Sequence, residues 1–278
     1  TDLLRDAEAN GLRIGQLHAE YGPAQVELSL AAADPVTAAD RQLLARQTVL
    51  AAAARHGLRV SFAPLPSLQL AGNGWHAHTS LWRDGKNVLA GGLDGPDDPA
   101  GAAYIAGLLR DLPALAAVTA PSLGSLARLR PGFFAGAYRF WGVENREAPV
   151  RYVAGSPLLG ADYANVELKV SDASANPYLA LTALLTAGVA GVEDGLVPPA
   201  PFASDPGTWT EDERSAAGVV PLPTTPAEQE AALLACERIT TALGEERLGA
   251  FLAVRRAEAA WAAERETEDV LAALRWRY

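Results

Sequence analysis

The spacing of apolar side chains predicts helices over much of the chain. Residues 35–57 carry apolar side chains at helical spacing, with Thr37 as the expected N-cap and Gly57 just past the C-terminal end. A second helix, rich in Ala and Leu, is predicted over residues 99–118. A third begins at Asn176-Pro177, because Asn caps helix N-termini well and Pro is tolerated in the first turn.

The C-terminal third of the chain combines a loop with further helix. Residues 197–223 are rich in Pro and Gly and are predicted to form a long surface loop. After them, Thr225-Pro226-Ala227-Glu228 predicts a capping box, and helical periodicity continues almost to Tyr278. The single cysteine, Cys236, falls within this helical pattern and is expected to be a small buried apolar residue. One cysteine allows no disulfide within the chain.

Alternation of apolar and polar residues predicts strands between these helices. The stretch LRVSFAP, residues 58–64, alternates and predicts a strand directly after the first helix. The run WHAHTSLW, residues 75–82, alternates again and ends at a turn around Asp84-Gly85. As a strand it would place four side chains on one face: His76, His78, Ser80 and Trp82.

The order of these elements indicates the fold class. No repeat of fixed period and no low-complexity linker divides the chain. We therefore expect a single α+β domain over residues 1–278, with mostly antiparallel strands, helices packed outside them and a helical C-terminus.

Composition and charge exclude several classes of protein. The chain has 23 Lys and Arg against 33 Asp and Glu, a net charge of −10, so nucleic acid is not an expected partner. With 49% hydrophobic and 20% charged residues it can bury a large core, yet apolar runs fall short of the roughly 18 residues of a membrane span. We expect a soluble cytoplasmic protein with no membrane partner. Because the sequence starts at Thr1 and contains no methionine, we expect a segment to precede it.

Two of the four histidines fall in one short motif. His76 and His78 follow Gly72-Asn73-Gly74 and would be neighbours on one strand face. A glycine-rich turn allows backbone to approach a ligand closely, and an imidazole pair suits a metal or a phosphate. Histidines that are merely hydrogen-bonded at a strand surface would give the same pattern, so both interpretations stay open.

Two carboxylates form a second candidate site. Glu20 and Glu27 flank Gly22-Pro23, and they would converge if this dipeptide interrupts a strand. Hard cations such as Mg²⁺ or Mn²⁺ require oxygen ligands of this kind, although two solvated strand carboxylates remain the alternative. Further along, alternation puts Glu167 and Lys169 on one face of a strand, which by itself indicates little.

Arginines gather in one segment of this otherwise acidic chain. They belong to Arg128-Leu129-Arg130-Pro131-Gly132, to Glu144-Asn145-Arg146-Glu147 and to Arg151. The guanidinium group binds phosphate and carboxylate through two parallel hydrogen bonds, so the segment suggests anion recognition. A charge-balanced, solvated surface is the alternative.

Taken in order, these segments resemble the glutamine synthetase family. GNGWHAHTSLWRDGKNVLAGG (72–92) is similar to the family's GNGMHxHxSLW segment, and ANVELKVSDASANPYLALTALLTAGVAGVEDGL (164–196) to its RIExRxPDxxANPYLAxAALLxAGLDGI segment. HAEYGPAQVEL (18–28) resembles HHEVxPGQxE, and residues 126–151 resemble RLVPGYEAP…RNRSxxxR in order and spacing. The resemblance implies the family's catalytic domain, a curved antiparallel sheet with flanking helices, without the N-terminal β-grasp domain.

The resemblance also implies a divalent-metal centre of two Mg²⁺ or Mn²⁺ ions. Glu20 and Glu27 match ligands of one ion, while His76 and Glu167 match ligands of the other. In the family each ion takes a further Glu from an upstream strand, which would precede Thr1. We therefore expect both metal sites to be completed by that segment.

The remaining site residues are likewise matched position by position. Gly72 would border the glutamate site, and Arg128 matches the arginine that holds the substrate carboxylate. Lys169 stands where an arginine helps to bind substrate and the transferred phosphoryl group. The residues implied for ATP are His78, Ser80, Arg146 and Arg151, with Arg128, Arg146 and Lys169 as the catalytic set.

Three positions depart from the family pattern. Phe134 replaces the glutamate that closes over the ammonium site, Lys169 replaces an arginine, and Asn165 replaces a basic residue. In this block the chain looks more like the FluG/nodulin-type fusions and the actinobacterial γ-glutamyl-amine ligases than like the enzyme of nitrogen assimilation. Because Phe134 can neither attract ammonium nor take its proton, either another carboxylate, Glu144 or Glu147, substitutes, or an apolar wall accepts a larger amine.

The function implied is an ATP-dependent carboxylate-amine ligase. It would activate the γ-carboxylate of glutamate as an acyl phosphate and join it to ammonia or a small amine. Two alternatives remain: an ordinary glutamate-ammonia ligase and a non-catalytic regulatory or assembly protein. Because the family builds active sites between neighbouring subunits, the resemblance also implies a homo-oligomeric, dodecamer-like ring.

Overall fold

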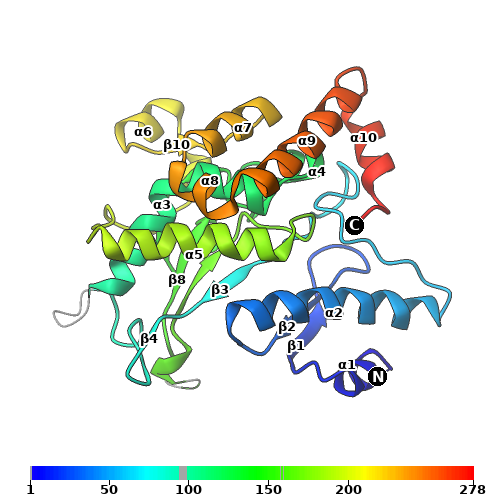
Figure 1. The fold of residues 1–278 in the computed structure, drawn as a ribbon, viewed down its shortest axis with the longest axis horizontal. Helices are drawn as coiled ribbons and strands as arrows, with labels where there is room; N and C mark the ends of the chain where they lie inside the picture. Colours follow the sequence, from blue (N-terminus) through cyan, green and yellow to red (C-terminus); the bar gives the residue numbers. More distant parts are fainter. Residues whose placement is uncertain (1, 94–98, 157, 159) are drawn as a thin grey trace.

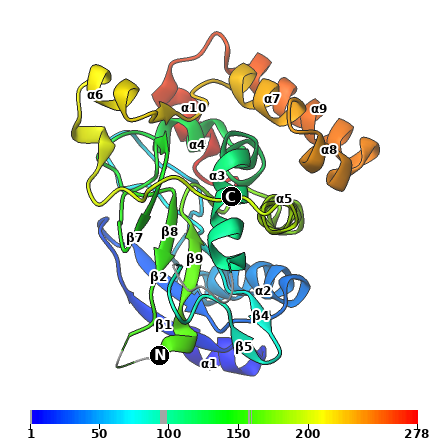
Figure 2. The same ribbon diagram turned by 90° about the vertical axis from the view of Figure 1, so that its left-hand side faces the viewer.

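The computed structural model describes residues 2–93, 99–156, 158 and 160–278 (Figure 1). Its centre is a small sheet covered by long helices, with an N-terminal hairpin unit at one end and a group of C-terminal helices at the other (Figures 1 and 2). The chain thus forms the expected α+β arrangement. Shorter helices and turns connect these parts along the sheet edges.

The central sheet has the strand order β3-β9-β8-β7. Its strands are β3 (Ala77–Thr79), β9 (Asn165–Leu168), β8 (Val150–Val153) and β7 (Trp141–Val143). The β3-β9 and β9-β8 pairs are antiparallel, whereas β7 and β8 are parallel. Alternation gives the sheet two faces: Val150, Tyr152, Val166 and Leu168 lie in the core, while Arg151 and Glu167 pair across the opposite face.

Two long helices cover the apolar face of the sheet. They are α3 (Ala100–Thr119) and α5 (Pro177–Glu193), which pack against each other along their length (Figure 2). α3 is long and apolar enough to span a membrane by length and composition, but 83% of its most apolar stretch is buried inside the fold, as in the core helix of a globular domain. Three glycines allow this packing: a Cβ at Gly107 would lie 2.8 Å from Gly191 Cα, and one at Gly188 would enter the ring of Tyr104.

The N-terminal unit is a hairpin backed by two helices. Strands β1 (Ile14–Ala19) and β2 (Val26–Leu30) pair antiparallel, and α1 (Asp2–Ala9) packs on α2 (Pro35–Ala54). Ala7, Leu12 and Ala45 form a small second apolar cluster between them.

The remaining elements are short pieces at the sheet edges and a C-terminal helical group. The C-terminal helices pack on one another and on the short helix at Leu123–Arg128. The end of the chain lies against the N-terminal half, where the Phe62 N–H donates to Tyr278 O (3.1 Å). These elements are α4 (Leu123–Arg128), η1 (Ala161–Tyr163), η2 (Pro206–Thr208), α6 (Glu211–Ala216), α7 (Pro226–Leu234), α8 (Glu237–Leu243), α9 (Glu245–Ala262), α10 (Thr267–Leu274) and the paired short strands β4 (Trp82–Arg83) with β5 (Lys86–Asn87) and β6 (Tyr138–Arg139) with β10 (Val220–Pro221).

Two local predictions in the N-terminal half are wrong. The N-cap of α2 is Asp34, whose carboxylate accepts the Thr37 N–H (3.1 Å), so the helix begins earlier than a Thr37 cap would allow. Residues 58–64 form no strand: they run extended against the C-terminus, where the Ser61 hydroxyl donates to the Arg275 carbonyl. Alternation alone could not reveal that no neighbouring strand is present to pair with this segment.

Predictions in the C-terminal third need a similar correction. Residues 197–223 are not one loop, because they contain η2, α6 and β10. Thr225 does cap α7, but the Glu228 carboxylate accepts from Thr224 N–H (2.8 Å), so the reciprocal bond of a capping box is displaced by one residue. Cys236 is half-buried at the junction of α7 and α8.

The α3-α5 contact yields a stability prediction. Gly107→Ala should lower the free energy of unfolding by about 1–3 kcal/mol, because the added methyl overlaps the backbone of α5 and the helices must move apart. The matched control is Gly249→Ala, in exposed helix α9 with nothing within 4 Å of the added carbon; it should gain up to about 1 kcal/mol from helix propensity. Urea unfolding followed by circular dichroism measures both. Equal effects at the two positions would contradict the close helix crossing.

Candidate functional site

The β1-β2 hairpin brings three possible metal ligands together. His18 pairs in register with Glu27, and Glu20 follows at the end of β1, where its N–H donates to Gln25 O (2.9 Å). His18 Nδ1 lies 3.6 Å from Glu20 Oε2, and His18 Nε2 lies 3.8 Å from Glu27 Oε1. Gly22-Pro23 therefore does interrupt the strands so that Glu20 and Glu27 converge. We did not predict His18 as a member, although its place two residues before Glu20 on one strand face was the available signal.

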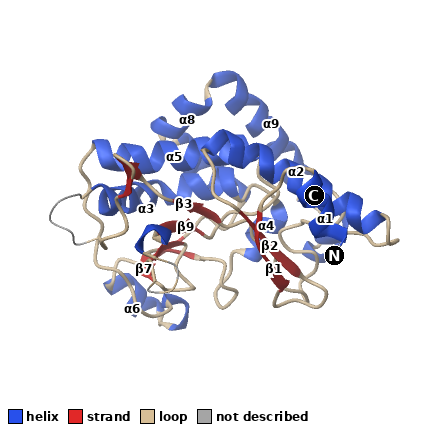
Figure 3. Cartoon of the chain, turned by 90° about the horizontal axis from the view of Figure 1, so that it is seen from below, coloured by secondary structure: helices blue, strands red, loops and turns tan. Residues whose placement is uncertain are grey.

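The hairpin turn is tied to the strand that carries the histidine pair. Gln25 Nε2 donates to Gly72 O (2.9 Å) and to Asn73 Oδ1 (2.7 Å). Asn73 in turn donates to Ala63 O (2.8 Å), which anchors the start of this segment. The hairpin and the central sheet lie side by side in the views of Figures 2 and 3. The hairpin cluster and the segment before the histidine pair, 47 residues apart at Gln25 and Gly72, thus belong to one region.

Glu167 is the centre of the second cluster. Its side chain is 2% exposed and faces three partners on neighbouring strands. His76 Nδ1 lies 3.0 Å and His78 Nε2 3.7 Å from Oε1, while Arg151 Nε lies 2.6 Å from Oε2. The sheet register explains this arrangement, because Glu167 is paired with His78 on β3 and with Arg151 on β8. The prediction that His76 and His78 share one face is confirmed.

Charge sets the protonation of this cluster. Burial acts to raise the pKa of Glu167, but the hydrogen bond and charge of His76, followed by Lys169 and His78, outweigh it and hold the pKa at about 2. Burial lowers the pKa of His76 more than Glu167 raises it, which favours the neutral imidazole. Asn165 Oδ1 lies 2.8 Å from His78 Nδ1 while the Asn165 amide donates to Tyr163 O (2.8 Å), so Asn165 holds the imidazole with Nε2 towards Glu167.

The residues of both clusters suit divalent cations. One ligand atom each from His18, Glu20 and Glu27 falls within 4.8 Å of the others, and carboxylate with imidazole is a donor set that Mg²⁺ or Mn²⁺ accepts. At Glu167 the ionised carboxylate and the neutral His76 are in the protonation states that a metal requires. The predicted metal ligands therefore have compatible chemistry in this structure.

Arg128 is buried beneath Gly72. Its guanidinium donates to the carbonyls of Val170 and Ser171 and lies 3.7 Å from Asp172 Oδ2, while its Nε has no hydrogen-bond partner among the described residues. A Cβ at Gly72 would fall 2.7 Å from Arg128 Cγ, so only glycine fits where these two segments of the chain meet. Burial lowers the pKa of Arg128 against the opposing charge of Asp172. The two predicted glutamate-site residues are thus in direct contact.

Lys169 continues β9 on the same face as Glu167. It is 6% exposed, and burial lowers the pKa of its ammonium group although Glu167 and Glu147 act to raise it. Within the described part of the chain its Nζ forms no hydrogen bond and no ion pair within 4 Å. A buried, unpaired ammonium is costly unless an anion reaches it.

The other predicted residues lie at the rim of this region. Arg146 and Ser80 are exposed, and the Ser80 hydroxyl accepts the Trp82 indole N–H (2.9 Å). Phe134 is 51% exposed with φ +51, in a loop that also contains the exposed Phe133. A left-handed backbone at a large aromatic residue is uncommon and marks a strained position in this loop.

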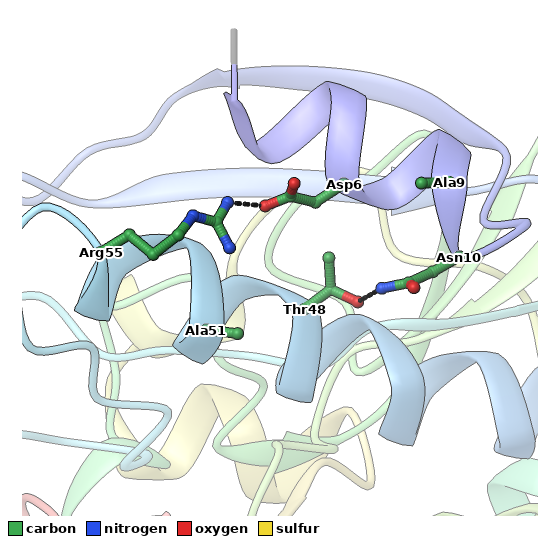
Figure 4. Close-up of a pocket in the computed structure, with 6 residues that line it drawn as sticks. All are labelled: Asp6, Ala9, Asn10, Thr48, Ala51 and Arg55. Carbon is green, nitrogen blue, oxygen red and sulfur yellow. Dashed lines mark hydrogen bonds and ion pairs between the residues drawn. The ribbon is translucent and has the colours of Figure 1, made fainter.

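One surface pocket lies outside these clusters. A cavity of about 200 Å³ between α1 and α2 is bounded by the Asp6–Arg55 ion pair and by Asn10, which donates to the Thr48 hydroxyl (2.9 Å) (Figure 4). These contacts satisfy one another and join the two helices. None of the predicted site residues lines this pocket.

Comparison with known proteins agrees with the resemblance that the sequence motifs indicate. Residues 1–271 match the catalytic domain of glutamine synthetase. The gamma-glutamylpolyamine synthetase GlnA3 of Streptomyces coelicolor is 44% identical over 278 residues, covering 100% of this chain and 60% of that protein. A glutamine synthetase of Clostridium saccharobutylicum is 36% identical over 259 residues, covering 92% of this chain and 57% of that protein.

Solved structures agree with the sequence comparisons. A protein described as a novel glutamine synthase homolog superposes with a TM-score of 0.82 at 30% identity, covering 99% of this chain and 62% of that chain. GmaS in complex with ADP superposes with a TM-score of 0.83 at 30% identity, covering 96% of this chain and 60% of that chain. The chain spans about 60% of the length of these relatives. From the shared motifs, the sheet that carries them and these matches together, the chain belongs to the glutamine synthetase family.

Proposed function

We propose that the protein containing this chain is an ATP-dependent carboxylate-amine ligase that joins the γ-carboxylate of glutamate to an alkyl amine. The observation that carries the proposal is a combination of two features. The metal-type ligands Glu20, Glu27, His76 and Glu167 are all present, and the resemblance puts Phe134 where the family has the glutamate that closes over ammonium. The similarity to a protein named as a gamma-glutamylpolyamine synthetase supports an amine larger than ammonia.

The residues divide the chemistry between binding and charge neutralisation. His78, Ser80, Arg146 and Arg151 would bind ATP, and Arg128 with Gly72 would bind glutamate. Ligases of this family use ATP and divalent metal ions, and such ions would neutralise phosphate charge when held by His18, Glu20 and Glu27 and by His76 and Glu167. Lys169 offers a buried positive charge for the phosphoryl group or the substrate carboxylate. Transfer of the γ-phosphoryl group from ATP to the glutamate carboxylate would release ADP and form the acyl phosphate. The amine, after losing its ammonium proton, would then attack the acyl carbon: the C–N bond forms, the C–O bond to phosphate breaks, and phosphate and a second amine proton leave.

The acceptor end of the site explains the proposed preference. The Phe134 ring is half exposed and can cover the alkyl part of an amine, whereas it offers ammonium no negative charge. The neighbouring Phe133 ring is occupied by the Arg130 guanidinium, which lies 3.8 Å from its centroid. Phe134 is therefore the more available of the two rings.

We also propose a cytoplasmic homo-oligomer, arranged as the ring that the resemblance implies. ATP and glutamate are cytoplasmic metabolites, which supports the location. Beside the Glu20-Glu27 cluster, Tyr21 is 87% and Val26 63% exposed. Apolar side chains exposed next to a site support a subunit contact there.

A panel of amines tests the proposed function directly. With glutamate, ATP and Mg²⁺, the intact protein should release phosphate faster with putrescine or spermine than with ammonia at equal concentration. The reason is that apolar contact at Phe134 adds binding energy only for an alkyl amine. Phosphate release that requires ammonia alone would instead support an ordinary glutamate-ammonia ligase, and none with any amine would support a non-catalytic protein.

Substitution of Phe134 tests the acceptor preference. Phe134→Glu should improve the use of ammonia and lower kcat/KM for putrescine about tenfold to a hundredfold, because aromatic contact worth roughly 1–3 kcal/mol is exchanged for a carboxylate. Phe134→Leu is the control: it keeps an apolar side chain, so ammonia use should stay low. Steady-state kinetics with both amines measures the ratio. If Phe134→Glu leaves the ratio unchanged, Phe134 lies outside the amine pocket.

Metal binding can be tested without an activity assay. Glu27→Gln should weaken Mn²⁺ binding to the hairpin cluster at least about tenfold, since the cation loses a charged oxygen ligand near His18 and Glu20. Glu246→Gln, an exposed carboxylate at the start of α9, is the control and should bind like the unsubstituted protein. Isothermal calorimetry with Mn²⁺ gives both affinities. Identical binding by all three proteins would remove the hairpin from the metal centre.

A further inference from the structure

Glu147 lies in a short, well-anchored loop between β7 and β8. Asn145 fixes this loop: its amide donates to Phe202 O (2.9 Å) and to Ser204 O (3.1 Å), and its Oδ1 accepts the Glu147 N–H (3.0 Å). The following Ala148 N–H donates to Asn145 O (3.2 Å). The backbone that carries the Glu147 carboxylate is therefore held on both sides.

Three loops meet around this carboxylate. A Cβ at Gly136 would lie 2.7 Å from Pro149 Cβ, so the Phe134 loop packs against the segment that follows Glu147. A Cβ at Gly207 would lie 3.2 Å from Pro131 Cβ, which brings the Asp205 loop against the same Phe134 loop. The Asp205 carboxylate accepts the Gly207 N–H (2.7 Å) and so is held at this junction.

The charges that face Glu147 come from each of these segments. Half-burial is the main cause that raises the pKa of its carboxyl group, and Asp205 raises it further; Lys169 and the backbone N–H of Phe134 act in the opposite direction. Among the described residues Glu147 forms no ion pair within 4 Å. A half-buried carboxylate that faces a second carboxylate without a close counter-ion gains stability from a bound cation.

Lys169 is a second charged residue at this place, and it lies on a different element from Glu147. Its backbone N–H donates to Pro149 O (2.9 Å), which ties β9 to the Glu147 loop. Its ammonium group is buried, is influenced by Glu147 and has no hydrogen bond or close ion pair within the described residues. Glu147 and Lys169 are thus opposite charges near each other that form no ion pair within 4 Å, so both charges remain for substrate groups.

The other acidic candidate, Glu144, is engaged elsewhere. Its Oε1 accepts the Ala154 N–H (2.8 Å) at the far end of β8, and the residue is exposed with φ +52. No hydrogen bond or ion pair joins it to the Phe134 loop within the described part of the chain. Of the two carboxylates, only Glu147 adjoins Phe134.

We propose that Glu147 is the residue that determines acceptor specificity, by binding an ammonium group of the amine beside the Phe134 ring, with Asp205 as a second negative charge for a diamine or polyamine. The inference rests on the proposed ligase function and names its acceptor class. A carboxylate binds the ammonium group, and the aromatic ring covers the adjacent alkyl chain or contacts the cation through its face. A diamine or polyamine binds to both carboxylates, whereas a monoamine binds to Glu147 alone. The nitrogen at Glu147 becomes the nucleophile once its ammonium proton has passed to the Glu147 carboxylate or to water.

Kinetics on carboxylate-to-amide variants of the intact protein test this role. In Glu147→Gln the KM for putrescine should rise about tenfold or more, because a charge-assisted hydrogen bond becomes a neutral one. The KM values for glutamate and ATP should change less than about twofold, while the KM for n-butylamine, which binds to Glu147 alone, should rise by a factor similar to that for putrescine. Glu144→Gln, from the same loop region, is the matched control and should behave like the unsubstituted protein. Asp205→Asn should raise the KM for putrescine but not for n-butylamine.

The outcomes separate this inference from the proposed function. Two results would show that Glu147 does not bind the amine, although the ligase function stands. In the first, the unsubstituted protein ligates putrescine and Glu147→Gln does so with an unchanged KM for putrescine. In the second, Glu147→Gln raises the KM values for glutamate and putrescine by the same factor. If the unsubstituted protein ligates no amine, the proposed function fails and the inference with it. Should Glu147→Gln not fold, Glu147→Asp keeps the charge on a shorter side chain and should raise the putrescine KM by a smaller factor. An unchanged KM in Glu147→Asp together with a folded protein would also overturn the assignment.

Discussion

Glu167 places an ionised carboxylate in the interior of a small sheet, and much of the architecture around it serves to make that burial tolerable. A buried charge is costly unless charged or hydrogen-bonding groups surround it. Here the strand register supplies them, since His78 and Arg151 are paired with Glu167 across β3 and β8, and His76 reaches it from the residue before β3. The apolar side chains Val166 and Leu168 on the opposite face pack under α3 and α5 and hold β9 in this register.

The same constraint explains how distant segments form one site. A polar face of the sheet can be covered only by groups that also satisfy hydrogen bonds, and Gln25 does this for the hairpin by bonding to Gly72 and Asn73. Gly72 must then lie directly over the Arg128 stem, which is why a side chain cannot be accommodated there. Hairpin, glycine turn and buried arginine are therefore linked through contacts, although they lie far apart in sequence.

The two ends of the site differ in what they conserve of the family pattern. The end with His18, Glu20, Glu27, His76 and Glu167 has the ligand groups that divalent cations require. At the other end Phe134, in a left-handed backbone, stands where the resemblance expects a glutamate, and the buried Lys169 stands where it expects an arginine. The hairpin and the β3-β9 pair carry the first group, whereas the Phe134 loop lies before β6.

The sequence by itself determined the helices over residues 35–54, 100–119 and 177–193, because these depend on local periodicity and on caps. It also determined the convergence of Glu20 and Glu27, the shared face of His76 and His78, and the family, because these depend on short specific motifs. It failed where pairing decides the outcome. Residues 58–64 alternate like a strand but meet the C-terminus instead of a neighbouring strand, and the Pro- and Gly-rich segment before Thr225 still folds into short elements.

Only the tertiary structure added His18 to the hairpin cluster, separated Glu147 from Glu144 and left Lys169 buried without a close partner. The reason is that burial and charge proximity arise between segments far apart in the chain, and no local pattern records which loops will meet.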